Sequence, residues 1–272
     1  MLTGACAPNG PITAQDITTF RMAGFRAAKL LASDHMPSDV ALLKLQGVEK
    51  FLVRLFDTYN SVRDFKEGQY VADCVGVIER FYPEGVRDYE VDNEPNITWL
   101  ARGLNEWQYR YYMLRVIPEI RRQVVAKGMR DVRLGFAPLS LAIEYNPKAW
   151  LWVCKDVVEI CDFVCINNYW QFPKYAYWRE FGGACVWYHE LFPKKELQIT
   201  EWGNSLVHSN PPPTQAQIEA AQVEQYPAWL KWISQFGYVS ATYVFQVGGT
   251  QEWAGFKLTD KAARAIGCGA TS

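Results

Sequence analysis

Short apolar runs and longer amphipathic stretches alternate along the chain. The short runs are rich in β-branched and aromatic residues, which is typical of buried strands. In the longer stretches, apolar residues recur every three or four positions, as they do on one face of a helix. The clearest such stretch carries the apolar residues Trp107, Tyr111, Leu114, Ile117, Ile120 and Val124. Its exposed side carries Arg115, Arg121 and Arg122.

This pattern predicts eight strands, at 2–6, 25–32, 48–57, 86–93, 131–137, 162–169, 197–202 and 239–246. It predicts helices at 13–24, 38–46, 65–81, 107–124, 147–160, 175–191, 214–236 and 260–266. Thr13 and Asp16 have the spacing of a capping box that starts the first helix. We expect the glycine pair at 182–183 to interrupt the sixth helix and Pro227 to kink the seventh.

Strands that alternate with helices predict a parallel sheet with helices outside it. Eight units in 272 residues average 272/8, or 34 residues each. This is the size of a (β/α)₈ TIM barrel, and we predict one such catalytic domain over 1–272. An open, doubly wound sheet is the alternative. No Gly-x-Gly-x-x-Gly follows the first strand, which disfavours the dinucleotide-binding form of that sheet.

Composition excludes several classes of function. With 28 basic and 29 acidic residues the net charge is −1, so the chain lacks the basic surface that nucleic acid requires. No apolar run reaches the ~18 residues of a membrane span. The first ten residues show neither the basic start nor the apolar core of a signal peptide. We therefore expect neither a nucleic-acid nor a membrane partner. We favour a cytoplasmic monomer over a secreted enzyme whose leader has been removed.

The seven cysteines and three histidines are scattered, and no Cys-x-x-Cys occurs. Zinc sites need paired short spacings, so we expect no metal ion and no cofactor. Aromatic residues are unusually frequent, at 15% of the chain with 11 Trp. Some belong to the core, but Trp and Tyr also stack on flat apolar faces such as those of sugar rings. Their positions therefore decide what they indicate.

Two glutamates stand at the ends of predicted strands, where TIM barrels hold their active sites. Strand four ends in Asn93-Glu94-Pro95, and strand seven ends in Thr200-Glu201-Trp202-Gly203. The two glutamates are 201 − 94 = 107 residues apart, about three units of 34. Two carboxylates across one cleft are what glycoside hydrolysis requires. The alternative is a pair of solvated loop glutamates, which the apolar strands before them disfavour.

With these two motifs the chain resembles the clan A retaining glycoside hydrolases. The segment 255–260 is similar to the one that follows strand eight in that clan. The resemblance implies cleavage of β-glycosidic bonds in an oligo- or polysaccharide by retaining double displacement. Glu94 would be the acid/base, Glu201 the nucleophile, and Asn93 a ligand of the sugar 2-hydroxyl. A general acid needs a raised pKa, whereas the nucleophile must stay ionised.

The same resemblance suggests further substrate contacts. Tyr169 stands where the clan often has a tyrosine that bonds the nucleophile, and Asn167 stands where a histidine is usual. Strand eight lacks the tryptophan that often forms the floor of the site. The candidates to replace it, or to line flanking positions, are Trp170, Trp202, Trp253, Trp99 and Phe172. Each of these aromatic residues has ordinary loop packing as its alternative.

Charged residues are also expected inside the barrel. The pleat of a strand would put Glu90, Asp92 and Glu94 on one face. A buried Glu90 needs a cationic partner, for which Arg54 and Lys29 are candidates. In the clan a basic residue near strand two or three often orders the nucleophile, so Arg54 has either that role or a structural ion pair deeper in the barrel.

Several polar residues follow other strands. His35 and Asp57 come just after strands two and three, and there they could bond sugar hydroxyls. We expect His208 to lie on a surface loop. Asn96-Ile97-Thr98 is a formal glycosylation sequon. We treat it as chance, because a glycan there would block the cleft.

Two other functions remain open. A phosphate-binding aldolase or isomerase barrel is suggested by the glycine-rich segment 248–250 after strand eight. A catalytically inactive carbohydrate-binding barrel would keep the aromatic residues without using the glutamates as catalysts. The first leaves both glutamates unexplained, and the second is disfavoured because both are present.

Overall fold

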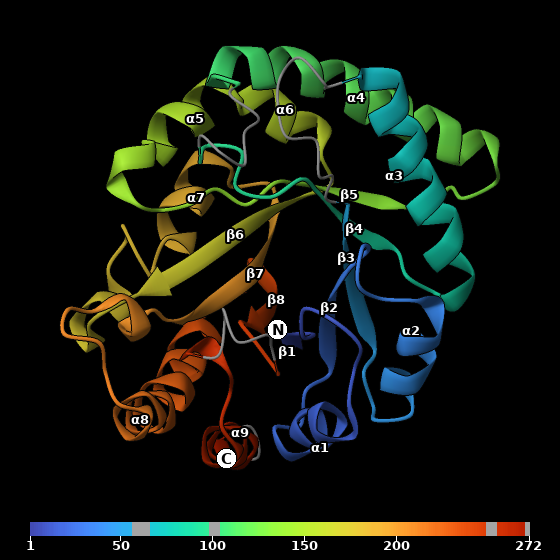
Figure 1. Ribbon diagram of the computed structural model, residues 1–272. Helices are drawn as coiled ribbons and strands as arrows, with labels where there is room; N and C mark the ends of the chain where they lie inside the picture. The colour runs from blue at the N-terminus through green and yellow to red at the C-terminus, as the bar shows by residue number, and fades with distance from the viewer. Residues whose placement is uncertain (56–65, 98–103, 249–254, 270–272) are drawn as a thin grey trace.

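The computed structural model describes residues 1–55, 66–97, 104–248 and 255–269. Eight parallel strands form a closed barrel in sequence order, and the helices form an outer ring around it (Figure 1). The barrel closes where the first strand pairs with the last, with Leu2 opposite Ala241 and Ala5 opposite Val244. The predicted fold class, a (β/α)₈ TIM barrel, is confirmed.

All eight strands lie where the hydrophobic pattern predicts them. They are β1 (Leu2–Cys6), β2 (Ala27–Leu31), β3 (Lys50–Leu55), β4 (Asp88–Val91), β5 (Arg133–Phe136), β6 (Phe163–Trp170), β7 (Glu196–Asn204) and β8 (Val239–Val244). The fourth strand ends two residues before the predicted boundary at 93, and the seventh runs two residues beyond 202. Both differences lie at the carboxyl end of the barrel.

The helices begin and end close to their sequence signals. They are α1 (Ala14–Met22), α2 (Pro37–Lys44), α3 (Glu67–Phe81), α4 (Glu106–Ala126), α5 (Pro147–Val153), α6 (Lys155–Ile160), α7 (Cys185–Leu191), α8 (Gln215–Ile233) and α9 (Asp260–Gly269). The predicted capping box is present, since the Asp16 carboxylate accepts the Thr13 N–H at 2.8 Å and the Thr13 hydroxyl accepts the Asp16 N–H at 3.3 Å. The predicted helix at 147–160 is divided at Cys154 into α5 and α6.

The predicted helix at 175–191 is wrong over its first half. Only Cys185–Leu191 is α-helical, and before it a 3₁₀ turn, η3 (Pro173–Tyr177), leads into a tight loop. A Cβ at Gly182 would collide with the Ala176 carbonyl, and one at Gly183 would crowd the Tyr177 carbonyl. The glycine pair therefore lets the chain fold back on itself, where we expected only an interrupted helix.

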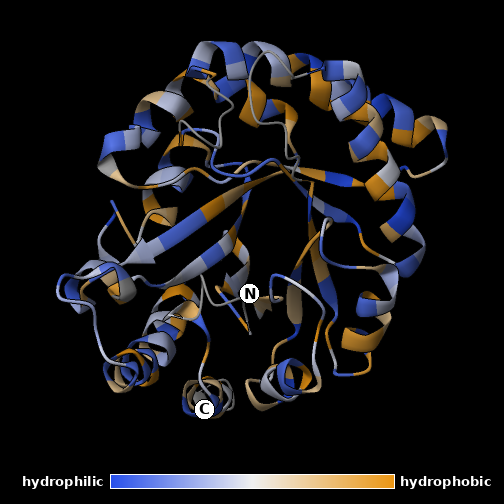
Figure 2. Cartoon of the chain, in the orientation of Figure 1, coloured by the Kyte–Doolittle hydropathy of each residue, from blue (hydrophilic) through white to orange (hydrophobic). Residues whose placement is uncertain are grey.

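Apolar side chains fill two layers. The larger core lies between the strands and the amphipathic helices, which show alternating hydrophobic and hydrophilic residues in Figure 2. A smaller cluster fills the barrel and includes Leu52, Phe163 and Tyr243. No helix within the described ranges is long and apolar enough to cross a membrane. The described residues also hold no group of His, Cys, Asp or Glu that could bind a metal ion, and no disulfide joins any of the seven cysteines.

Candidate active site

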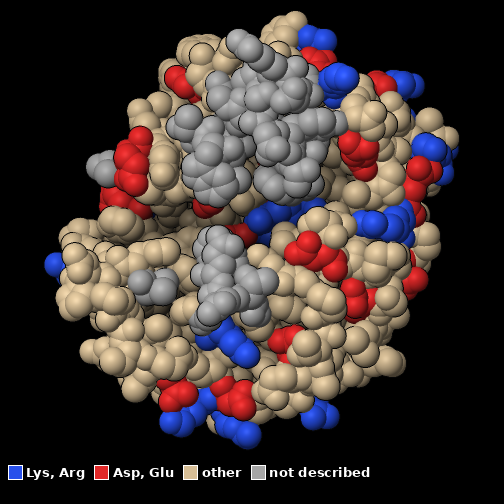
Figure 3. All heavy atoms as spheres, viewed as in Figure 1, with Lys and Arg blue, Asp and Glu red and all other residues tan. Residues whose placement is uncertain are grey.

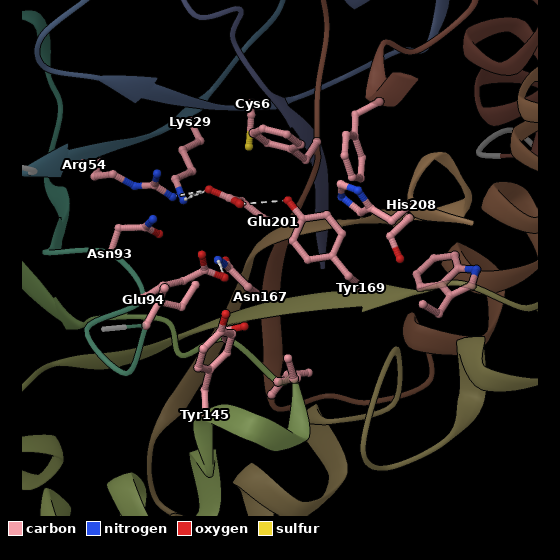
Figure 4. A pocket seen from close by; sticks show the side chains of 18 of the residues that line it. Cys6, Lys29, Arg54, Asn93, Glu94, Tyr145, Asn167, Tyr169, Glu201 and His208 are labelled. Atoms are coloured by element: carbon pink, nitrogen blue, oxygen red, sulfur yellow. Dashed lines mark hydrogen bonds and ion pairs between the residues drawn. The ribbon is translucent and has the colours of Figure 1, made fainter. Parts of the chain in front are cut away.

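A cleft of about 950 Å³ opens at the carboxyl ends of the strands. Every strand, or the segment after it, contributes to its described wall. Glu94 and Glu201 both line this cleft, together with Asn93, Asn167 and Tyr169 (Figure 4). Two residues that are 107 positions apart in the sequence therefore share one hollow, at the end of the barrel where the sequence placed them.

A turn positions Glu94, and the pleat of β4 does not reach it. The strand ends at Val91, and the chain then passes through positive φ values at Asp92 (71°) and Glu94 (43°). Our prediction that the pleat aligns Glu90, Asp92 and Glu94 is therefore wrong beyond the strand end. A positive φ is unfavourable for residues other than glycine, and backbone strain of this kind is concentrated at functional sites.

Hydrogen bonds hold Glu94 in this turn. Its backbone N–H donates to the Pro138 carbonyl at 2.9 Å, and its own carbonyl accepts the Ile97 N–H at 3.0 Å. The Asn167 amide donates to Glu94 Oε1 at 3.1 Å and accepts the Thr200 hydroxyl at 3.2 Å. Asn167, which stands where the clan usually has a histidine, therefore orients the carboxyl group of Glu94.

The pKa of Glu94 is raised from 4.5 to about 7. Burial is the main cause, because removal from water disfavours the charged form. The negative charge of Glu201 acts in the same direction, and the Asn167 hydrogen bond partly opposes them. Glu94 is therefore protonated over much of the range below neutrality and can donate a proton.

Glu201 lies inside β7, next to an irregularity in strand pairing. Ile166 pairs with Ile199 and Asn167 pairs with Glu201, so Thr200 is skipped on the β6 side. Such a bulge re-aims the side chains beside it. The Thr200 carbonyl accepts the Cys6 thiol at 3.4 Å, which ties the bulge to β1 across the barrel.

Three donors surround the Glu201 carboxylate (Figure 4). The Arg54 guanidinium donates to Oε1, Lys29 Nζ lies 3.2 Å from the same oxygen, and the Tyr169 hydroxyl donates to Oε2 at 2.8 Å. Burial alone would raise the pKa of Glu201, but these neighbours outweigh it and lower the pKa to about 2. Glu201 is therefore ionised under conditions where Glu94 holds its proton.

Glu90 completes what we call the upper ion cluster, which consists of Lys29, Arg54, Glu90 and Glu201. Its side chain is fully buried and lies 2.8 Å from Lys29 Nζ and 2.5 Å from Arg54 Nε. Both cations thus bridge Glu90 and Glu201. Arg54 forms the predicted ion pair with Glu90 and also contacts Glu201, and Lys29 contacts Glu201 as well, which we did not predict.

Asn93 lies on the cleft wall beside the two glutamates. Its side-chain oxygen has no hydrogen-bond partner in the described part of the chain. Its backbone N–H donates to the Asp92 carboxylate at 2.8 Å, which fixes its place in the turn. The contact of Asn93 with a sugar hydroxyl stays a prediction.

Two predicted sugar platforms pack in the core. Trp202 is fully buried, its ring lies 4.5 Å from that of Trp229, and it does not line the cleft. Successive strand residues point to opposite faces, so with Glu201 in the cleft its neighbour faces the helices. Trp170 borders the cleft, but it is only 1% exposed, stacks on Trp202, and donates its indole N–H to Gln225 at 2.7 Å. Trp202 and Trp170 were therefore wrong as platforms.

His35 was also wrong as a sugar ligand. It is 1% exposed and is not among the residues that line the cleft. Its Nδ1 bonds the Leu31 backbone at 3.1 Å, and burial lowers its pKa. The side chain therefore packs beneath the turn after β2.

Three further predicted contacts, Asp57, Trp99 and Trp253, lie outside the described residues.

Other cleft residues were missed. His208 is exposed, as expected, but it also lines the cleft, with its ring 5.5 Å from that of Phe256. Ser140 and Tyr145 line it from the segment after β5. Their segment is bonded to buried Asn96, whose amide donates to the Ser140 carbonyl at 2.8 Å and accepts its N–H at 2.9 Å. The rule that strand ends carry the site would have included Ser140 and Tyr145 had it been extended along the loop after β5.

The glycine-rich segment after β8 gives no support to phosphate binding. Gly249 and Thr250 lie outside the described residues. At Gly248, an added Cβ would collide with the Asp16 carboxylate. A carboxylate so close to this backbone disfavours an anion there.

The chain matches no protein-family model and no curated protein sequence. Solved structures nevertheless share its fold. An endo-β-1,3-glucanase of glycoside hydrolase family 128, subgroup I, from Amycolatopsis mediterranei, solved with laminaritriose, is 14% identical with a TM-score of 0.59. The alignment covers 100% of this chain and 99% of that one. A curdlan-specific exo-β-1,3-glucanase of subgroup III from Blastomyces gilchristii is 16% identical with a TM-score of 0.62, over 97% of both chains.

A glucosidase from Croceicoccus marinus is 14% identical with a TM-score of 0.64. The alignment covers 97% of this chain and 62% of that one. At these identities the likeness shows the fold, which is a (β/α)₈ barrel of the kind that glycoside hydrolases use.

Proposed function

We propose that the protein is a retaining β-glycosidase in which Glu94 is the acid/base and Glu201 the nucleophile. One observation carries the proposal: two glutamates line one cleft, and their pKa values are moved in opposite directions, to about 7 and about 2. Pairs of carboxyl groups whose surroundings separate their pKa values divide the roles of acid and base between them.

The first step forms a covalent intermediate. The Glu201 carboxylate attacks the anomeric carbon while Glu94 gives its proton to the departing glycosidic oxygen. The products are a glycosyl ester of Glu201, a free hydroxyl on the leaving sugar, and an ionised Glu94. Asn93 would bond the sugar 2-hydroxyl as the transition state develops.

The second step uses the change in charge that the first step creates. Esterified Glu201 is neutral, so the negative charge that raised the pKa of Glu94 is gone, while Lys29 and Arg54 keep their positive charges. The pKa of Glu94 therefore falls, and its carboxylate stays ionised at neutral pH. It accepts a proton from water, whose oxygen attacks the anomeric carbon and breaks the bond of that carbon to Glu201, so the sugar is released with retained configuration and Glu201 is again a carboxylate.

A neutral glucan with β-1,3 linkages is the first substrate to test. Two of the similar structures belong to enzymes named as β-1,3-glucanases, one solved with laminaritriose. In the described part of the cleft, both Lys29 and Arg54 are already paired with carboxylates. Neither cation is left to neutralise an acidic sugar, so the cleft suits an uncharged glucan.

The decisive experiment compares four proteins on laminarin, curdlan, a panel of other β-glucans and chromogenic β-glycosides. We expect the wild type to hydrolyse at least one of them, and both Glu94→Gln and Glu201→Gln to lose activity. Glu144→Gln is the matched control, because Glu144 also lines the cleft and carries no proposed role in the reaction. Proton NMR of the fresh product gives the stereochemistry, for which we expect the β-anomer.

Two results would contradict this proposal. Binding of a glucan by the wild type without hydrolysis of any substrate would indicate the inactive carbohydrate-binding barrel. Release of the α-anomer would show inversion, and Glu201 would then be a base for water and not a nucleophile.

A further inference from the structure

Four aromatic side chains cluster in the loop after β6. We call Phe172, Tyr175, Trp178 and Phe181 the aromatic rim. The Tyr175 ring is its centre, with ring-centre distances of 5.7 Å to Phe172, 4.6 Å to Trp178 and 5.0 Å to Phe181. The Tyr175 and Phe181 rings are nearly parallel, at 23°, while the other two meet Tyr175 edge-on.

The aromatic rim extends from the cleft onto the outer surface. Tyr175 and Phe181 are half-buried and line the cleft, whereas Phe172 is 46% and Trp178 49% exposed. In Figure 3 the surface on the left of the view, where β6 ends, is formed mainly by uncharged residues. Large exposed apolar side chains that adjoin a binding cleft indicate a contact surface.

The loop is held rigidly in place. The Gly182 carbonyl accepts hydrogen bonds from buried Asn168 and Trp229, both at 3.0 Å. The backbone N–H of Gly182 donates to the Tyr175 carbonyl at 3.2 Å, and that of Gly183 donates to the Trp178 carbonyl at 2.9 Å. A surface that is ordered before its ligand arrives loses little conformational entropy on binding.

We propose that the aromatic rim binds a neutral β-linked glucan chain where that chain leaves the cleft. Pyranose rings have flat faces of C–H groups, which stack on aromatic rings while the hydroxyl groups at their edges stay in water. The proposal rests on the proposed function, because the same chain would occupy the cleft and the rim. Lys174, whose ammonium lies 4.9 Å from the centre of the Tyr175 ring, adds a donor for sugar hydroxyls.

Continuity with the cleft favours a glucan over a protein partner as the occupant. A chain bound across Glu94 and Glu201 must leave the cleft over some part of its edge, and the rings of the aromatic rim run outward from Tyr175 and Phe181. The rim therefore matters for long substrates and little for those short enough to lie within the cleft. This dependence on chain length distinguishes it from a general effect on folding or catalysis.

The test uses the double variant Phe172→Ala/Trp178→Ala on laminarin and on laminaritriose. We expect the KM for laminarin to rise about tenfold, the size expected for the loss of two ring contacts, and the ratio of the two KM values to shift by at least about fivefold. Trp152→Ala is the matched control, because Trp152 is a tryptophan on α5 that is 75% exposed and lies outside the cleft and the aromatic rim. It should leave that ratio unchanged.

Electrophoresis through gels that contain laminarin measures binding without catalysis. We expect the Glu201→Gln protein to be retarded, and retardation to be lost when Phe172→Ala and Trp178→Ala are added. Equal changes in KM for the long and short substrates, or unchanged retardation, would overturn the role of the rim. Absence of hydrolysis by the wild type would instead overturn the proposed function. Retardation that depends on the two rings would then still support the rim as a glucan-binding surface.

Discussion

Two ion clusters inside the barrel carry the same charges and have different surroundings. The upper ion cluster lies at the cleft. A second group, which we call the basal ion cluster, consists of Lys50, Asp88, Arg133 and Glu196, the first residues of β3, β4, β5 and β7. Lys50 lies 2.9 Å from Asp88 and 3.5 Å from Glu196, and Arg133 contacts both carboxylates. Each cluster thus joins two cations to two carboxylates.

Exposure separates the two clusters. Side chains of the upper ion cluster are at most 9% exposed, whereas Lys50 is 20%, Glu196 30% and Arg133 35% exposed. Water screens the basal charges, so their pairs contribute little beyond local order. In the upper ion cluster the charges are screened less, because water is largely excluded from them.

The second difference is a carboxyl group beside the upper ion cluster that bonds none of its cations. Glu94 lies beside the upper ion cluster and bonds the neutral amide of Asn167 instead of a cation of the cluster. Its pKa rises. The pKa of Glu201 is lowered chiefly by Lys29 and Arg54, and that of Glu196 is lowered by the hydrogen bond from the Ser240 hydroxyl and by its two cations. The comparison teaches that a count of charges does not single out a candidate acid, whereas burial of a carboxyl group that bonds no cation does.

The largest expected effect is on kcat/KM, when one glutamate of each cluster is replaced by glutamine. Glu201→Gln should lower kcat/KM by more than about 1,000-fold, because the amide cannot form the glycosyl ester. Glu196→Gln removes a carboxylate from the same strand and should change kcat/KM less than about threefold while lowering stability by about 1 kcal/mol. Initial rates on the best substrate and thermal unfolding measure the two effects. Comparable loss of activity in both variants would contradict the comparison.

Glu90 should behave as a positioning residue. Glu90→Gln removes a negative charge, so Lys29 and Arg54 act more strongly on Glu201 and Glu94, and both limbs of the pH profile of kcat/KM should move to lower pH. We expect kcat to fall roughly 10- to 100-fold, because both cations lose the partner that fixes them. Asp88→Asn, two residues earlier on β4, is the control and should move neither limb. A loss of stability without a shift in the profile would reduce Glu90 to a structural role.

Tyr169→Phe should have a smaller effect. It removes the hydroxyl that donates to Glu201, so the pKa of Glu201 rises, the acidic limb moves to higher pH, and kcat/KM falls about tenfold. A profile from about pH 2 to about pH 9, which reaches the pKa values of both carboxyl groups, measures both changes. Tyr226→Phe, a buried tyrosine on α8 whose hydroxyl accepts the Asn204 N–H, should leave the acidic limb in place.

The smallest effect concerns stability. The pKa of Glu94 is about 7 in the folded protein and near 4.5 in the unfolded chain, so the folded state keeps a proton that the unfolded state releases. The contribution of Glu94 to wild-type stability therefore falls as pH rises from 4.5 to about 7. Glu94→Gln lacks this dependence, so its thermal midpoint relative to the wild type should rise over that range and level off above it. A difference that is constant with pH would contradict the raised pKa of Glu94.

Strand order accounts for most of the features that the sequence predicts correctly. The alternation of strand-like and helix-like stretches was enough to predict the barrel. The rule that active sites lie at the carboxyl ends of barrel strands located Glu94 and Glu201. Neither predicted the turn at Asp92, because no local signal shows that β4 stops at Val91. The aromatic segment 175–181 has helix-like spacing, yet the close approach of Gly182 to Ala176 fixes it as a loop.

Other outcomes depended on contacts between distant segments. Trp202 could have been assigned to the core, since it must face away from the cleft once Glu201 faces it. The position of His208 in the cleft could not have been predicted, because it depends on the path of a loop that meets Phe256 from another strand. Lys29 was proposed only as a partner for Glu90, and its contact with Glu201 joins β2 to β7 across the closed barrel, which no local pattern shows.

The buried amide of Asn96 has a consequence for how the protein can be produced. Glycan transfer to a sequon replaces one side-chain N–H, and in a eukaryotic secretory host it takes place before the chain has folded. The Asn96 nitrogen donates to the carbonyls of Ser140 and Tyr145, at 2.8 and 3.4 Å, in a space that the folded protein closes. A glycoform made in yeast would be unable to form these two bonds beside Glu94, whereas a bacterial host avoids the conflict.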